Sequence, residues 1–140
     1  MNSKKFLLGT LVGGISFFIF GYLIYGLALV SFFNQHTVAS AGSMRTMNEI
    51  IWWALILGNL ASGALLTYIF LKLGNISSFA SGAGTAAVIG FFMTLSMAFV
   101  RYATSNSFDL TGVLVDVIAA TVLTAIAGGI IAVVIGKGNK

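Results

Sequence analysis

Four long apolar stretches constrain the fold of this chain more than any other feature of its sequence. They cover residues 6–33, 49–71, 79–102 and 111–136. Each stretch is at least as long as the ~20 residues that a helix needs to cross the ~30 Å hydrocarbon core of a bilayer. The pattern predicts an all-α membrane protein, a four-helix transmembrane bundle with antiparallel up-down topology. We expect a single transmembrane domain over residues 1–140.

The composition excludes a separate water-soluble domain. Of the 140 residues, 59% are hydrophobic and only 7% are charged, and the mean hydropathy is +1.05. A soluble domain carries roughly 25% charged residues, because its surface faces water. The net charge of +4 is scattered without a Lys/Arg cluster, which argues against nucleic-acid binding. The absence of cysteine excludes disulfides and thiolate metal sites.

The lysines predict how the bundle is oriented. In four predicted spans, one side of the membrane would carry Lys4, Lys5, Lys72, Lys137 and Lys140, and the other would carry Arg45 and Arg101. Because cytoplasmic loops are enriched in positive charge, we expect both termini and the turn at Gly74 to be cytoplasmic. The turn at Gly74 is short, so the second and third spans are predicted to be antiparallel neighbours. The expected location is the cell (inner) membrane, with several passes.

Aromatic residues mark the predicted outer boundary. We counted ~20 residues from the inner end of each span to find where it should leave the hydrocarbon. Tyrosine and tryptophan prefer this interfacial level, where their rings lie at the height of the lipid headgroups. The aromatic residues that fall there are Tyr22, Tyr25, Trp52, Trp53 and Tyr102.

Four polar residues form the candidate site. Asp116 and Arg101 come out at the same depth, at the outer membrane edge, and are either a proton or ion site or an ion pair that fixes helix register. Glu49 is predicted to open the second span, where the helix dipole favours a negative charge. Asn59 lies near mid-membrane, where no water can satisfy its amide. It is either a hydrogen-bonding link between helices or a substrate-binding group.

Small residues recur every four positions in two of the spans. Such rows let helix backbones approach closely in lipid, where packing and hydrogen bonds replace the hydrophobic driving force. We therefore expect the third and fourth spans to pack on these rows, and further association through glycine-rich faces. The predicted packing residues, with the GxxxG pair of the first span, are Gly9, Gly13, Gly82, Ala86, Gly90, Gly112, Gly128 and Ala132.

Catalytic patterns are absent from the sequence. There is one histidine, no convincing carboxylate pair, and no phosphate-binding loop of the Walker or dinucleotide type. We expect neither an enzyme nor a bound metal or cofactor.

Residues 20–27 read Phe-Gly-Tyr-Leu-Ile-Tyr-Gly-Leu. This segment resembles the aromatic-glycine signature in the first helix of a family of small bacterial membrane proteins, known only as a domain of unknown function. That family usually has a Trp-Tyr pair, often followed by proline, where this chain has Ile24-Tyr25 and then Gly26-Leu27. The resemblance implies four spans over a similar length, and it implies no activity or site.

Two functional classes remain from the sequence. One is a structural or accessory membrane component that packs against itself or against partners. Its expected partners are the lipid bilayer and a homo-oligomer or larger membrane complex. The alternative is a small permease or channel for an ion or small molecule, with Asn59 and the region of Asp116 and Arg101 on its path.

Overall fold

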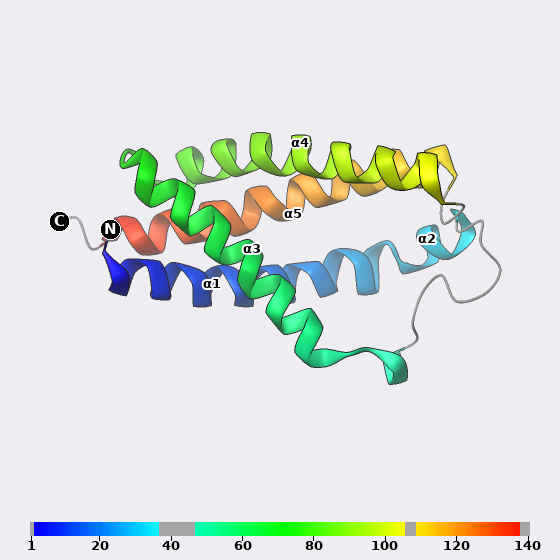
Figure 1. The fold of residues 1–140 in the computed structure, drawn as a ribbon, viewed down its shortest axis with the longest axis horizontal. Helices are drawn as coiled ribbons and strands as arrows, with labels where there is room; N and C mark the ends of the chain where they lie inside the picture. Colours follow the sequence, from blue (N-terminus) through cyan, green and yellow to red (C-terminus); the bar gives the residue numbers. More distant parts are fainter. Residues whose placement is uncertain (1, 37–46, 106–108, 138–140) are drawn as a thin grey trace.

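The computed structural model describes residues 2–36, 47–105 and 109–137, and every regular element in these ranges is helical. Figure 1 shows long helices that run side by side. In chain order the elements are α1 (Ser3–Gly21), the π-helix η1 (Tyr22–Ala28), α2 (Val30–His36), the 3-10 helix η2 (Met47–Glu49), α3 (Trp52–Leu73), α4 (Phe79–Thr104) and α5 (Leu110–Gly136).

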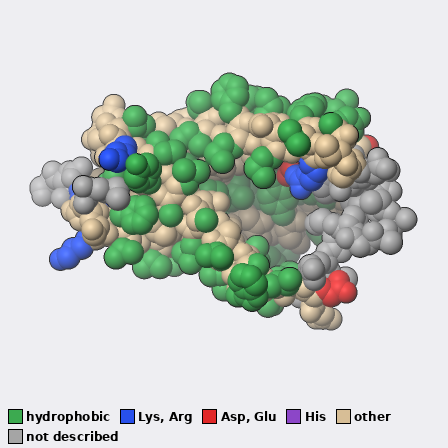
Figure 2. Space-filling view, viewed as in Figure 1, with side chains coloured by type: hydrophobic (Ala, Val, Ile, Leu, Met, Phe, Trp, Pro, Cys, Tyr) green, Lys and Arg blue, Asp and Glu red, His purple; other side chains and the backbone are tan. Residues whose placement is uncertain are grey.

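Four helical segments are long and apolar enough to cross a membrane. Their mean hydropathies lie between 1.8 and 2.5. Their surface along the helices is largely hydrophobic, and the charged side chains that are visible gather near the two ends (Figure 2). The segments are Ser3–Ala28, Trp52–Leu73, Phe79–Thr104 and Leu110–Gly136. The prediction of an all-α, four-span bundle is therefore confirmed.

Two helix boundaries differ from the predicted ones. The first span is interrupted at Leu29, whose backbone (φ −111°, ψ 4°) leaves the helix between η1 and α2. Glu49, predicted to open the second span, lies in η2 instead. Ile51 is extended (φ −87°, ψ 91°), so α3 begins only at Trp52. Glu49 therefore lies outside the first helical turn, where the dipole would favour it.

The helices alternate in direction, so the start of α1 and the end of α5 lie at the same end of the bundle (Figure 1). We call this the terminal end and the opposite one the far end. Helix α5 is central and contacts α1, α4 and, over a shorter length, α3. Helix α3 packs chiefly on α1, crosses it obliquely, and makes little contact with α4. The expectation that the second and third spans are close neighbours is therefore wrong.

The contact between α4 and α5 depends on backbone-to-backbone approach. A Cβ atom added to Gly82 would meet Cβ of Ala132 and would lie 2.5 Å from the carbonyl oxygen of Gly128. One added to Gly128 would meet Cβ of Ala86. Ala86 and Ala132 are fully buried. No larger side chain fits between these helices, and four of the predicted packing residues lie at this contact.

The other predicted packing residues lie farther along the α4–α5 contact, at the contact between α1 and α3, and in the first turn of α5. A Cβ on Gly90 would lie 2.6 Å from Cβ of Thr124, across the same α4–α5 contact. A Cβ on Gly9 would meet the side chain of Thr67 of α3. Gly112 is buried in the first turn of α5.

The crossing of α1 and α3 explains why α3 leaves α4. A Cβ on Gly13 would lie 2.8 Å from Cα of Gly63, and one on Gly63 would lie 2.7 Å from the backbone nitrogen of Gly14. These three glycines let the two backbones touch, and this contact sets the direction of α3 more strongly than the short connection to α4 does. Gly14 and Gly63 were not among the predicted packing residues, because neither has another glycine four positions away.

We predict that Gly82→Ala lowers the stability of the bundle and that Gly84→Ala does not. The first change forces a methyl group into the α4–α5 contact and should cost about 1–3 kcal/mol. Gly84 has no neighbouring atom within 4 Å of the added Cβ. Its replacement therefore causes no clash and gains the higher helix propensity of alanine, worth up to ~1 kcal/mol. Thermal unfolding followed by circular dichroism in detergent measures both. Equal midpoints for the two variants would contradict the packing described.

Candidate functional site

The π-helix η1 places Tyr25 against α5. Helix α1 continues directly into η1, and at its end the N–H of Leu29 donates to the carbonyl of Ile24, 2.9 Å away and five residues earlier. A π turn holds more residues per turn than an α turn, so it changes which side of the helix each following side chain faces. The hydroxyl of Tyr25 thereby reaches Asp116, 91 positions further along the chain.

Asp116 joins three helical segments near the far end. Its Oδ1 accepts a hydrogen bond of 2.9 Å from the Tyr25 hydroxyl, and its Oδ2 lies 3.4 Å from Nη2 of Arg101. The Asp116 side chain is 16% exposed, whereas that of Arg101 is 53% exposed. A strong charge-assisted hydrogen bond measures about 2.7–2.9 Å. Tyr25 is therefore the closer partner of Asp116, and Arg101 is a looser one.

A second polar link closes the far end between α2 and α5. Nδ1 of His36 lies 2.8 Å from Oδ2 of Asp109, and the backbone N–H of Asp109 donates to the carbonyl of His36 over 3.1 Å. The other carboxylate oxygen of Asp109 accepts from the N–H of Gly112 at 2.8 Å and caps α5. The Gly112 N–H and, next, the His36 side chain hold the pKa of the Asp109 carboxyl below its usual range.

The predicted aromatic residues divide into two groups. Tyr22, Trp52, Trp53 and Tyr102 are all exposed on the helix surfaces, where they can meet lipid. Tyr25 instead turns inward, with its ring stacked on Phe33 at 5.6 Å between centroids. Counting residues from the inner end of each span puts Tyr25 and Asp116 at nearly the same depth. The sequence therefore indicated that the two side chains could meet. It could not indicate the direction of the tyrosine ring, which depends on the π turn.

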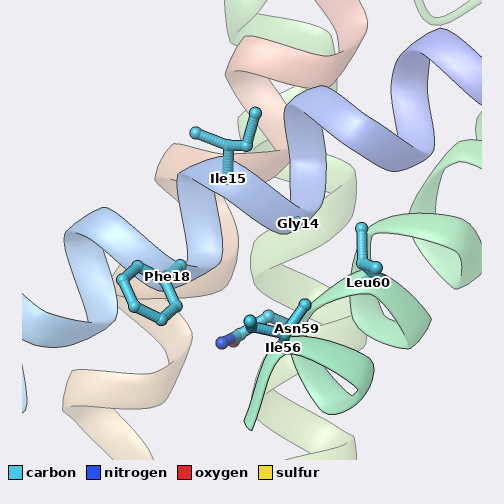
Figure 3. Close-up of a pocket in the computed structure, with 6 residues that line it drawn as sticks. All are labelled: Gly14, Ile15, Phe18, Ile56, Asn59 and Leu60. Atoms are coloured by element: carbon cyan, nitrogen blue, oxygen red, sulfur yellow. The ribbon is translucent and has the colours of Figure 1, made fainter. Parts of the chain in front are cut away.

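Asn59 lies beside a crease between α1 and α3. The crease has a volume of about 240 Å³ and is lined by Gly14, Ile15, Phe18, Ile56, Asn59 and Leu60. Figure 3 shows the Asn59 side chain extending from α3 into the space near Phe18 of α1. Within residues 2–36, 47–105 and 109–137, no side chain or backbone group hydrogen-bonds to this amide. Asn59 therefore lacks, among these residues, the interhelical partner that its depth requires.

Glu49 and the remaining acidic residues do not form one site. Glu49 is exposed in η2, before α3. Among the described residues, no group of three or more His, Asp or Glu side chains gathers in a way that could hold a metal ion. The four polar candidates therefore occupy separate places: Asp116 with Arg101 between α4 and α5, Asn59 at the α1–α3 crease, and Glu49 in η2.

Comparison with protein families, with curated proteins and with solved structures finds no match for this chain. The fold defines the chain as a four-span, multi-pass helical membrane protein. Its resemblance to the uncharacterised bacterial family stays a prediction, and the segment that carries that resemblance coincides with the end of α1 and with η1.

We predict that Tyr25→Phe lowers the free energy of unfolding by about 1 kcal/mol, the usual value of one hydrogen bond. Tyr102→Phe is the matched control, because that side chain is exposed on α4 and should change stability by less than about 0.5 kcal/mol. The losses caused by Tyr25→Phe and Asp116→Asn should not add. The loss in the double variant should differ from the sum of the two single losses by about 0.5–1.5 kcal/mol, which is the interaction energy of the two side chains. Strict additivity in detergent unfolding experiments would show that the two side chains do not interact.

We predict that Asp109→Asn makes stability less sensitive to acid. The folded pKa of Asp109 is lowered, so its charged form stabilises the fold above its unfolded pKa of about 3.9. That stability is lost as the pH falls through the lower folded pKa. Asparagine keeps an oxygen that can cap α5 but does not titrate. The thermal midpoint should fall less steeply below about pH 4 in the variant than in the wild type. Parallel acid profiles would refute this role.

Proposed function

We propose that this protein is a structural or accessory component of the membrane, which associates with itself or with other membrane proteins and neither carries a solute nor catalyses a reaction. One observation carries the proposal. Most of the interior hydroxyls in the described part of the bundle donate to the backbone of their own helix. The buried hydroxyls of Ser16 and Thr67 donate to Val12 and Gly63, over 2.8 and 2.7 Å.

Other interior hydroxyls follow the same pattern. Thr121 and Thr124 of α5 donate to the carbonyls of Val117 and Ala120, each over 2.7 Å. A channel or permease needs groups that replace the hydration of its solute along a continuous path. Hydroxyls engaged with their own backbone are poor candidates for that task, and the core around them consists of Leu, Ile, Phe and Ala side chains.

The charged cluster at the far end supports a structural role in the same way. Asp116 is held by both Tyr25 and Arg101, so it ties η1, α4 and α5 into one register. An ionisable group at the membrane edge costs less than one at mid-membrane. The pair therefore fits a fixed link between helix ends better than a proton relay.

The orientation proposed for the bundle follows from its charges. Lys4, Lys5, Lys72 and Lys137 belong to the helix ends at the terminal end, and Arg101 belongs to the far end. The positive-inside rule then places the terminal end in the cytoplasm. We propose the bacterial inner membrane as the location, which rests on the family resemblance.

The alternative, a small permease or channel, has one observation in its favour. Two polar side chains near the α1–α3 crossing have no hydrogen-bond partner among the described residues: the amide of Asn59 and the buried hydroxyl of Thr10. Unpaired polar groups at depth are where a solute would bind, if one passed between these helices.

Reconstituted liposomes test the two functions directly. We expect purified protein to give no more proton, potassium or sodium flux than empty vesicles, measured with ion-sensitive dyes under an imposed gradient. A flux that Asn59→Leu abolishes, and that the surface change Val88→Leu leaves intact, would overturn the structural proposal and establish the permease.

A further inference from the structure

The half of helix α3 nearer the terminal end packs into the bundle, and the half nearer the far end is exposed. Leu66 and Phe70 are 2% and 1% exposed. By contrast, Trp52 and Leu55 are 48% and 41% exposed, and every residue from Ile51 to Gly58 is exposed. The helix leans away from the rest of the bundle toward the far end (Figure 1). Phe18 of α1 lies beside this half, with its ring centroid 6.3 Å from that of Trp52, but it leaves the residues from Ile51 to Gly58 exposed.

One face of α3 continues from the buried half into the bare half. Trp52, Leu55, Asn59, Ser62 and Leu66 follow one another at spacings of three, four, three and four residues. This spacing places them along one side of a helix and is the pattern of helices that pack in pairs. We call these five residues the α3 stripe. Leu66, the stripe residue nearest the terminal end, packs in the core of the bundle. The stripe is therefore a packing face whose other residues, toward the far end, lack a packing partner.

Asn59 shows what kind of partner is missing. Its amide carries two donors and one acceptor, and none of them is used by a described residue. In hydrocarbon there is no water to satisfy them. Lipid acyl chains have no hydrogen-bonding groups, so covering the stripe with lipid would leave the amide unpaired.

We propose that the α3 stripe is the contact surface for α3 of a second copy, with the two Asn59 side chains hydrogen-bonded to each other. An amide is self-complementary, because the N–H of one can donate to the oxygen of the other in both directions. A two-fold axis brings the same residue of two copies together. Asparagine in apolar helices forms such links between helices. The inference rests on the proposed function and assigns its self-association to one helix.

The chain contains no cysteine, so single cysteines can map this contact in full-length protein. Leu55→Cys places a thiol on the stripe. Leu57→Cys is the matched control, since Leu57 is 60% exposed and lies two residues on, about 200° around the helix from Leu55. Met97→Cys, 68% exposed on α4, reports on a different surface.

After oxidation in liposomes at low protein density, we expect a disulfide-linked dimer from Leu55→Cys at least about fivefold more abundant than from Leu57→Cys or Met97→Cys. Adding Asn59→Leu to Leu55→Cys should reduce the dimer about tenfold, and adding Asn59→Gln should reduce it much less. Circular dichroism of each variant checks that the helices are intact.

Different failures have different meanings. Cross-linking through Met97→Cys but not through Leu55→Cys would overturn the α3 interface and leave self-association standing. Cross-linking of Leu55→Cys that Asn59→Leu does not change would remove the amide pair from the proposal. In native membranes, a linked product of another mass would identify a different protein on the stripe and would overturn the second copy. No dimer at any position, with single-molecule counting that shows monomers, would overturn both the interface and self-association.

Discussion

The structure depends on close contact between helix backbones. Lipid tails are as apolar as leucine, so burying leucine between two helices gains little over leaving it in the bilayer. Attraction comes from packing, and glycine allows the closest packing. Gly82 and Gly128 let α4 meet α5, and Gly13 and Gly63 let α1 meet α3. The two contacts are independent, and α5 connects them because it lies against both α4 and α1. The direction of each helix follows from where these glycines fall.

The same solvent decides what happens to polar groups. Most of the interior hydroxyls return to the backbone of their own helix, which satisfies them without linking helices. Asp116 is satisfied between helices, by Tyr25 and Arg101. Asn59 and the buried hydroxyl of Thr10 are exceptions, since neither pairs with a described residue. A group that breaks a rule kept by its neighbours is the natural place to look for a contact outside the chain.

Much of the fold could be predicted from the sequence, because a membrane-spanning helix is recognised by its length and hydropathy alone. The α4–α5 contact was also predictable, since its small residues repeat every four positions in both helices. The path of α3 was not. It depends on Gly14 and Gly63, neither of which has another glycine four positions away, and on a crossing contact that outweighs the short turn at Gly74. The Tyr25–Asp116 bond was only half predictable: counting gives depth, whereas the direction of the ring depends on the π turn of η1.

The oblique path of α3 also affects the surrounding bilayer. A helix of 22 residues is ~33 Å long and helices of 26 or 27 residues are ~40 Å long. Because the shortest span is also the most inclined (Figure 1), the hydrophobic height of the protein is smaller on its α3 side than on its α4 and α5 side. Lipids next to α3 must thin, or the whole bundle must tilt, and either response has a modest energetic cost for each ångström of mismatch. The protein therefore has a built-in preference for membranes, or for neighbours, that match its shorter side.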